Sequence, residues 1–280
     1  MMKRIVSIQD ISCVGKCSLT VALPIISAMG VECAIVPTAV LSTHTAFSSF
    51  TFKDLTDQIK PISDEWKKQD IHFDAIYTGY LGSFEQLELV SKFFDAHRDD
   101  NTLIFVDPAM ADFGKLYPGF SPEFARAMGA TVCAKADIIV PNITEASFML
   151  GTEYVESGYS EDYIKDMLQG LCVLGAKKAV ITGVGFDPSK CGVMGYDSET
   201  GEYFTYFNDL VDARFHGTGD VFSSTTVGAL MNGRNLKDSL AIAADYTVQS
   251  ILKTVENEEH NWYGVDFETE IPYLLKRMGE

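Results

Sequence analysis

Positive charge is scarce in this sequence. Its 280 residues include 22 Lys and Arg against 39 Asp and Glu, which gives a formal net charge of −17. Nucleic acids and anionic membranes attract basic surfaces, so this balance argues against either as a partner. It does not exclude a small anionic substrate, because such a site needs only a few local donors.

Several other signals are missing. No apolar run approaches the length of a membrane-spanning helix. The start, MMKRIVSIQD, becomes charged too soon for a secretory signal. The six cysteines include no CxxC pair and no Cys/His cluster that completes a zinc site. We therefore expect a cytoplasmic protein with reduced thiols.

Short apolar runs alternate with amphipathic stretches over much of the chain. The runs predict strands at 3–9, 33–38, 75–79, 102–107, 137–141 and 178–183. Apolar residues at three- and four-residue steps predict helices over 18–29, 84–97, 121–130 and 160–174. This alternation predicts an α/β fold, with a mostly parallel sheet covered by helices on both faces.

The pattern changes after Thr182. Two runs at 191–197 and 202–207 flank a turn and predict an antiparallel hairpin. Apolar helices are expected at about 219–232 and 236–255. No Pro-, Gly- or Ser-rich linker divides the chain, so we expect one domain over 1–280, with a small lid around 42–55.

The stretch DISCVGKCS (10–18) has a Gly-Lys pair between an expected strand and an expected helix. It is not a Walker loop, because Asp10 stands where that motif requires glycine and Cys17 takes the Ser/Thr position. A Rossmann GxGxxG fingerprint is absent too, which excludes an ordinary dehydrogenase. Two interpretations remain open: an ordinary turn, in which Gly15 supplies a permissive dihedral and Ser18 caps the helix, or a loop that binds a small polar molecule.

The stretch HGTGDVFSS (216–224) is a stronger phosphate signal. Its glycines permit a tight turn, and a long apolar helix begins at once. Backbone amides at a helix N-terminus bind anions, and Asp220 falls in the first turn beside them. A base next to an anion hole suits phosphoryl transfer to an alcohol. The alternative is an ordinary Gly-rich helix start with a favourable acid.

Two further motifs also follow expected strands. In PNITEASFML (141–150), Asn142 and Glu145 are spaced for a capping box, and also for organising water around Mg²⁺. In DPAMAD (107–112), Asp107 and Asp112 are candidates to lie near phosphates, although Asp-Pro alone is a turn signal. Ligands of such sheets bind at the carboxyl ends of the strands, so all these motifs are expected to meet at one edge.

DPAMAD, PNITEA and HGTGDVFSS, in this order and spacing, resemble the ribokinase-like superfamily. TGYLGS (78–83) and LSTHT (41–45) are similar to its vitamin B6 kinase branch, the pyridoxal/pyridoxamine kinases. Hydroxymethylpyrimidine kinases share much of this layout. The resemblance implies a three-layer α/β/α sandwich that uses ATP and Mg²⁺ to phosphorylate a hydroxymethyl group on a pyridine. It also implies a homodimer and leaves any monovalent-cation requirement open.

The resemblance also implies roles for particular residues. Asp220 is expected to be the catalytic base, and the amides of Gly217, Thr218 and Gly219 the anion hole. Around the vitamer ring it places Asp10, His44, Thr45 and Tyr80. Along the nucleotide phosphates it places Asp107, Asp112 and Thr182, together with Asn142 and Glu145. The last two, with Asp107, are the residues expected at the metal.

Two positions depart from the branch. Asp10 stands where many members have a serine that contacts the pyridine, and an acid there favours a cationic amine such as pyridoxamine. Val140 stands where relatives often carry a threonine near the metal. Two rival functions stay open: a kinase of hydroxymethylpyrimidine or another small alcohol, and a non-catalytic vitamin carrier. The acid of the GTGD motif argues against the carrier, which needs no base.

Overall fold

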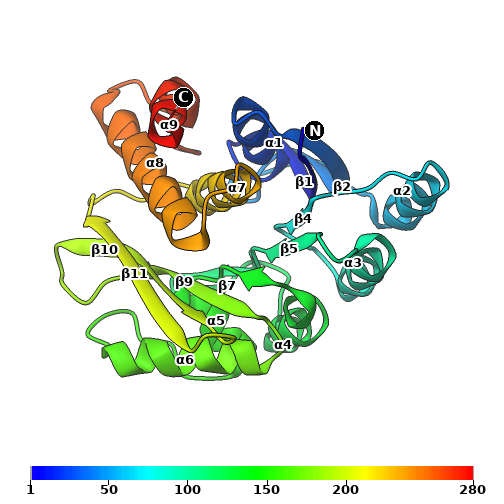
Figure 1. The fold of residues 1–280 in the computed structure, drawn as a ribbon. Coiled ribbons are helices and arrows are strands. Elements are labelled where there is room, and N and C mark those ends of the chain that lie inside the picture. Colours follow the sequence, from blue (N-terminus) through cyan, green and yellow to red (C-terminus); the bar gives the residue numbers. More distant parts are fainter. Residues whose placement is uncertain (1, 280) are drawn as a thin grey trace.

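A single sheet runs through the computed structural model, which describes residues 2–279. Its nine strands follow the order β11-β10-β9-β8-β5-β4-β1-β2-β3 (Figure 1). The strands span β1 (Arg4–Val14), β2 (Glu32–Thr43), β3 (Phe52–Asp54), β4 (Ala75–Thr78), β5 (Leu103–Val106), β8 (Ile138–Ile139), β9 (Lys178–Val184), β10 (Lys190–Asp197) and β11 (Glu202–Asp209). The six central strands, in the spatial order β9-β8-β5-β4-β1-β2, pair in parallel. At one end of the sheet β3 pairs antiparallel with β2, and at the other end β10 pairs antiparallel with both β9 and β11.

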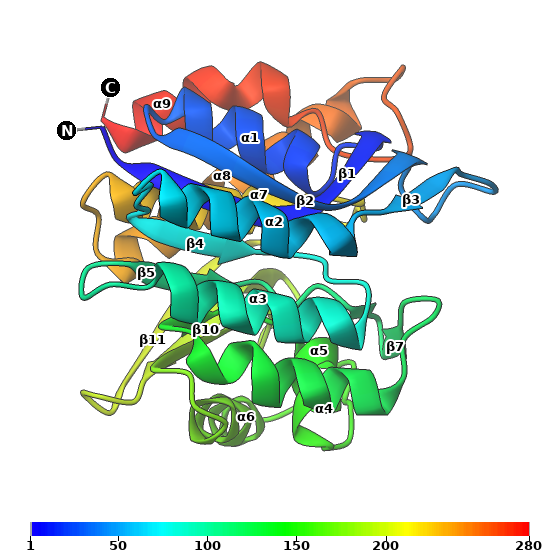
Figure 2. The same cartoon turned by 90° about the vertical axis from the view of Figure 1, so that its right-hand side faces the viewer.

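Helices cover both faces of this sheet. One face carries α2 (Thr56–Lys68), α3 (Phe84–His97), α4 (Pro122–Thr131), α5 (Ile143–Leu150) and α6 (Glu161–Val173). The other carries α1 (Leu19–Ala28), α7 (Thr218–Met231), α8 (Leu236–Glu256) and α9 (Ile271–Met278) (Figures 1 and 2). A separate two-stranded antiparallel ribbon is formed by β6 (Ala111–Asp112) and β7 (Lys115–Leu116). Two short 3-10 helices are also present, η1 (Cys133–Lys135) and η2 (Phe267–Glu270). The predicted three-layer α/β/α fold is confirmed.

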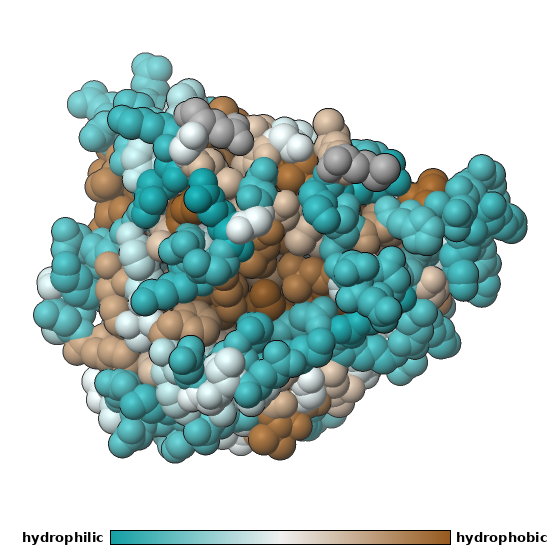
Figure 3. All heavy atoms as spheres, in the orientation of Figure 1, coloured by the Kyte–Doolittle hydropathy of each residue, from teal (hydrophilic) through white to brown (hydrophobic). Residues whose placement is uncertain are grey.

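The core is continuous on each side of the sheet because the strands are apolar on both faces. Val6, Ile8, Ile76 and Ile104 pack toward α2–α6. The opposite face buries Ile5, Tyr77 and Phe105 against α1, α7 and α8. Figure 3 shows that polar side chains cover most of one face of the molecule, with apolar residues visible in a hollow near its centre. Two-sided burial of this kind explains the near-continuous apolar runs of the central strands.

The bounds of several predicted helices and strands agree with the structure to within one residue, and both ends of α3 agree with the predicted helix at 84–97. β1 and β2 differ most, because each continues five residues beyond its predicted end, to Val14 and Thr43, where the two strands still pair. The polar residues Asp10 and Ser12 therefore lie in a strand and not in a loop, which corrects the expected boundary. Helix α2 was not predicted, since it is polar and contains Pro61. No helix within residues 2–279 combines the length and apolarity required to cross a bilayer.

Candidate active site

The carboxyl ends of the parallel strands meet the N-terminus of α7. Asp10 lies in the second half of β1, where its pairing with β2 is irregular, while Tyr80 follows β4, Asp107 follows β5 and Asn142 comes after β8. Helix α7 begins at Thr218 with Gly217 as its N-cap residue. Motifs that are far apart in the sequence are therefore gathered at one edge of the sheet.

Gly217 gives the GTGD turn its shape. Its φ is 80°, in the left-handed region that favours glycine. A Cβ at this position would collide with the backbone carbonyl oxygen of Lys16, so the turn packs directly against the β1–α1 loop. The first amides of α7 have no partner within the helix, which leaves the N–H groups of residues 217–219 available to an anion.

Asp220 stands in the first turn of α7. Burial raises the pKa of this carboxyl to about 7, and the nearby charges of Asp107 and Asp10 add to the effect. A carboxylate with a pKa close to neutrality is well matched to accepting a proton.

Asp107 lies near Asp220. Its Oδ2 accepts a 2.6 Å hydrogen bond from the hydroxyl of Ser223, and a Cβ on Gly219 would lie 4.0 Å from the same oxygen. Burial raises the pKa of Asp107 to about 6, although the Ser223 bond opposes the shift. A second carboxylate therefore lies beside the turn that carries Asp220.

Asn142 and Glu145 form the predicted capping box at the start of α5. Asn142 Oδ1 accepts from the Glu145 N–H at 2.9 Å, and Glu145 Oε2 accepts from the Asn142 N–H at 2.8 Å. Glu145 Oε1 also accepts from the Met110 N–H at 3.1 Å. Burial, and then the charge of Asp107, raises the pKa of Glu145. The box thus joins α5 to the DPAMAD segment and turns a buried carboxylate toward Asp107.

These carboxylates do not make a ready metal cage. Within residues 2–279 no three His, Cys, Asp or Glu side chains are placed to hold one ion together. Their negative charges nevertheless repel one another, since Asp107 raises the pKa of both Glu145 and Asp220. A divalent cation bound mainly through water and phosphate oxygens fits such a set, as is usual for Mg²⁺.

A pocket of about 190 Å³ opens beside this group. Its walls are Asp112, Phe113, Asn142, Ile143, Thr144, Tyr154, Glu156, Thr182, Gly183 and Arg214. The Arg214 guanidinium lies 4.3 Å from the centre of the Phe113 ring. Burial raises the pKa of Asp112, and the charge of Arg214 opposes this shift only in part. Sequence reasoning missed Arg214, although its position just before the GTGD motif was a usable signal.

The residues predicted around the vitamer are only partly grouped. Tyr80 packs its ring against Phe120, and burial raises its pKa to about 12 with a contribution from Asp10. Thr45 is exposed. Asp10 is buried, and both of its oxygens accept from serine hydroxyls. Ser18 does not cap α1 with its side chain, because its hydroxyl donates to Asp10 instead; of the two interpretations of this loop, the one in which the Ser18 side chain caps the helix is wrong.

His44 connects three loops at the same edge. Its Nε2 donates to the Tyr263 carbonyl at 3.0 Å and its Nδ1 accepts from the Ala46 N–H at 3.1 Å, so the imidazole is neutral with the proton on Nε2. Burial lowers its pKa, as does the neighbouring His216. Phe47, Trp262 and His216 surround the ring. His44 therefore offers a ring face, while both nitrogens are engaged within the protein.

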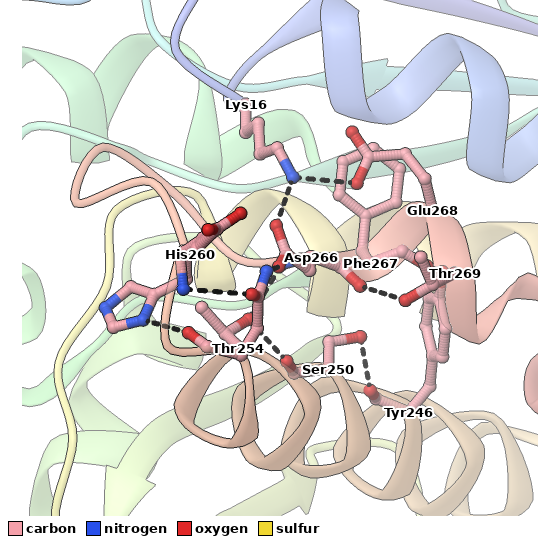
Figure 4. A network of polar contacts seen from close by, with 11 residues as sticks. Lys16, Tyr246, Ser250, Thr254, His260, Asp266, Phe267, Glu268 and Thr269 are labelled. Atoms are coloured by element: carbon pink, nitrogen blue, oxygen red, sulfur yellow. Dashed lines mark hydrogen bonds and ion pairs between the residues drawn. The ribbon is translucent and has the colours of Figure 1, made fainter.

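Lys16 points away from the GTGD turn. Figure 4 shows its side chain directed at Asp266 and Glu268, with Nζ–oxygen distances of 2.7 and 2.9 Å. The Asp266 N–H donates to the Thr254 hydroxyl at 2.7 Å. These bonds tie the β1–α1 loop to the segment between α8 and α9. The lysine of the Gly-Lys pair is a structural cation, in agreement with the absence of a Walker loop.

Replacing Lys16 with Met is expected to lower the melting temperature by a few degrees, because two carboxylates lose their shared cation in a half-buried setting. The KM for ATP should stay within about twofold of wild type. Melting curves and nucleotide saturation curves check this. Lys60→Met, which breaks only an exposed ion pair with Asp64, is the control and should leave both unchanged. A large rise in the KM for ATP would show that Lys16 contacts phosphate.

A second hollow, of about 780 Å³, lies at the opposite edge of the sheet. It is lined where β5, β8 and β9 begin, by residues that include Arg98, Leu103, Asp137, Ile138 and Lys178. Arg98 and Lys177 both pair with Asp137 there, at 2.7 and 2.8 Å. None of the predicted site residues lines it. Size alone therefore does not locate the functional site in this protein.

Comparison with known proteins agrees with this geometry. The model of the phosphomethylpyrimidine kinase family matches residues 22–263. The chain belongs to that family. A protein from Bacteroides thetaiotaomicron VPI-5482, solved in a form with pyridoxal, is 38% identical, with 98% of this chain and 96% of that one aligned at a TM-score of 0.92.

Curated and solved B6 kinases are similar over nearly the whole chain. A pyridoxal kinase of Dictyostelium discoideum is 28% identical over 93% of this chain and 88% of its own. The pyridoxal kinase of Lactobacillus plantarum is 28% identical, covers 99% of this chain and 98% of its own, and superposes with a TM-score of 0.89. The predicted membership of the ribokinase-like superfamily and its vitamin B6 kinase branch is confirmed, and the protein is a kinase.

Proposed function

We propose that this protein transfers the γ-phosphoryl group of ATP to the 5′-hydroxymethyl group of pyridoxal, pyridoxamine or pyridoxine. The observation that carries the proposal is the placement of the Asp220 carboxyl in the first turn of α7, beside the unpartnered amides of residues 217–219. The B6 kinases that match nearly the whole chain support the same substrate class.

In this proposal the chain's own groups divide the work. Asp220 accepts the proton of the hydroxymethyl group as the phosphoryl group moves. The amides of Gly217, Thr218 and Gly219 donate to the oxygens on which negative charge collects. Arg214 and Thr182, which line the same pocket as Asp112 and Asn142, lie along the nucleotide phosphates. Positioning and electrostatics supply most of the catalysis in such reactions.

Mg²⁺ bound with ATP supplies charge neutralisation for the phosphates. Asp107, Asn142 and Glu145 are the residues that we propose hold it, through water in the case of the capping-box pair. The raised pKa values of Asp107 and Glu145 fit this role, because a nearby cation would favour their charged forms. Asp112 is proposed to lie at the same phosphates.

The acceptor side of the site is proposed to include Tyr80, His44 and Thr45. Tyr80 and His44 offer aromatic surfaces, and Thr45 lies in the mostly exposed loop between β2 and β3. This loop is the core of the predicted lid at 42–55, which we propose covers the bound vitamer. A single kinase domain, a homodimer and a cytoplasmic location remain part of the proposal.

A hydroxymethylpyrimidine kinase is the second candidate, since the matching family is described as phosphomethylpyrimidine kinase. Turnover of pyridoxal, pyridoxamine, pyridoxine and hydroxymethylpyrimidine with ATP separates the two. We expect the highest kcat/KM for a B6 vitamer, by at least about tenfold. The reverse order would favour the pyrimidine, and turnover of none of the four would contradict both candidates.

Replacing Glu145 with Ala is expected to raise the Mg²⁺ concentration for half-maximal activity by about tenfold or more, while the KM of the vitamer changes little. The variant should also melt earlier, because the capping box is lost. Activity titrated with Mg²⁺ at saturating ATP provides the measurement.

Asn235→Ala is the matched control for that experiment. Asn235 caps α8 by accepting the Asp238 N–H at 2.9 Å, away from the site, so its loss should lower the melting temperature without moving the Mg²⁺ requirement. If Glu145→Ala behaved in the same way, the carboxylate would have only a capping role.

A further inference from the structure

Residues 257–266, the segment between α8 and η2, lie against the β1–α1 loop and were not predicted to belong to the site. Asp266 anchors the end of this segment, because its Oδ1 accepts a hydrogen bond from Lys16 Nζ at 2.7 Å (Figure 4). Gly264 is buried, and a Cβ there would lie 2.5 Å from Lys16 Cβ and 3.2 Å from the carbonyl oxygen of Gly15. The segment is therefore packed directly on the loop that leads into α1.

The same segment holds His44 at the start of the β2–β3 loop (44–51). The Tyr263 carbonyl accepts from His44 Nε2 at 3.0 Å, although the two residues are 219 apart in the sequence. On the other side of the ring, His44 Nδ1 accepts from the Ala46 N–H at 3.1 Å. His44 is 7% exposed, and a Cβ on Gly15 would lie 2.5 Å from its Cδ2. The imidazole is thus enclosed between the β1–α1 loop and the 257–266 segment, and it fixes where the β2–β3 loop begins.

Aromatic rings continue this contact along the β2–β3 loop. The Trp262 ring lies 4.7 Å from the Phe47 ring and 6.0 Å from the His44 ring, measured between ring centres. His44 in turn lies 4.8 Å from His216, which directly precedes the GTGD motif. Aromatic rings at such separations attract one another. Residues 44–47 are therefore held between the GTGD turn and Trp262.

We propose that Trp262 is a positioning residue for the acceptor. Together with the Tyr263 carbonyl it holds the β2–β3 loop in place over the vitamer ring. Thr45 gains a fixed position from this, because the bonded groups of His44 and Ala46 flank it. This inference rests on the proposed function. The pocket proposed to hold the nucleotide phosphates is lined by other residues, so the hold on the loop acts on the vitamer and not on ATP.

Replacing Trp262 with Ala tests this role. The side chain is 56% exposed, so its removal opens no cavity in the core. If the loop then occupies its proposed position only about a tenth of the time, the KM of each vitamer rises about tenfold, while kcat and the KM for ATP stay within about threefold of wild type. Trp262→Phe keeps an aromatic ring beside Phe47 and should recover most of the vitamer affinity.

Tyr203→Ala is the matched control. The Tyr203 ring lies 4.7 Å from the Tyr196 ring, the same distance as between Trp262 and Phe47, but at the edge of the sheet where β9 begins. Its loss should leave the vitamer KM unchanged. An equal rise of the vitamer KM in Trp262→Ala and Tyr203→Ala would mean a general effect of losing a surface ring, and it would overturn the inference.

Amide hydrogen exchange gives a readout that does not depend on turnover. The N–H groups of Ala46 and Phe47 are bonded within the loop, and in Trp262→Ala the peptides covering 42–51 should exchange at least about fivefold faster. Unchanged exchange there would overturn the inference, whether or not the wild type binds a vitamer. Faster exchange without a rise in the vitamer KM, or with an equal rise in the KM for ATP, would also overturn it. If the wild type phosphorylated no vitamer, the proposed function would fail, and the exchange rates would still decide whether Trp262 holds the loop.

Discussion

Replacing Asp220 with Asn is expected to lower kcat by about 10²–10⁴-fold, the usual contribution of a general base. Asn keeps the size and helix position of Asp220, but it no longer accepts a proton at neutral pH. Binding of ATP and of the vitamer should persist, because the amides of the GTGD turn are unchanged. Steady-state kinetics, both dissociation constants and the melting temperature should be measured on the same preparation.

The pH profile gives a second check on Asp220. Because burial raises its pKa to about 7, the free enzyme should lose kcat/KM as the pH falls below that value, when the carboxyl becomes protonated. The Asn variant should lack this limb. Asp107 and Asp10, which face the same carboxyl, are unchanged in the variant. A folded Asn variant with wild-type kcat would contradict the role of Asp220 as base.

Replacing Gly217 with Ala is expected to cause the second large loss. The residue has φ of 80°, and its new Cβ would meet the Lys16 carbonyl oxygen, a backbone atom that has no side-chain freedom with which to move. Either the turn or the β1–α1 loop must shift. Since the turn carries both Asp220 and the amides proposed to bind the anion, we expect kcat to fall by about 10²–10³-fold, as when an oxyanion-hole donor is lost, and the melting temperature to drop. Kinetics and thermal unfolding measure both effects.

Gly233→Ala is the matched control. Gly233 has φ of 79°, nearly the same as Gly217, but a Cβ added there would meet no atom within 4 Å. It therefore carries the cost of positive φ alone, and kcat should be unchanged. Equal losses of activity in the two variants would mean that the effect is general destabilisation and not displacement of the anion-binding turn.

Local patterns in the sequence predicted a large part of this structure. The period of apolar residues located α3 at both ends, and the spacing of Asn142 and Glu145 predicted the capping box that forms. Both are short-range features, set by residues three or four apart. The gathering of motifs at one sheet edge also followed, because parallel strands put their carboxyl ends side by side.

Long-range partners could not be predicted from the sequence. The bonds of Asp10 to Ser12 and Ser18 depend on how far β1 continues alongside β2, which no local pattern fixes. Lys16 pairs with Asp266, 250 residues away. Arg214 acquires its place only when the segment before the GTGD motif meets Asp112 of β6 across the pocket. Such contacts are set by tertiary packing, so residue type and spacing do not reveal them.

Direct detection of the product is the most decisive measurement. Incubation of the purified protein with ATP, Mg²⁺ and pyridoxal should release ADP and form an equal amount of pyridoxal 5′-phosphate, identified by mass and by the phosphorus resonance of a primary phosphate ester. The Asp220→Asn variant, under the same conditions, should form it at least about 100-fold more slowly. ADP release without a phosphorylated vitamer, or equal product from the variant, would contradict the proposed kinase.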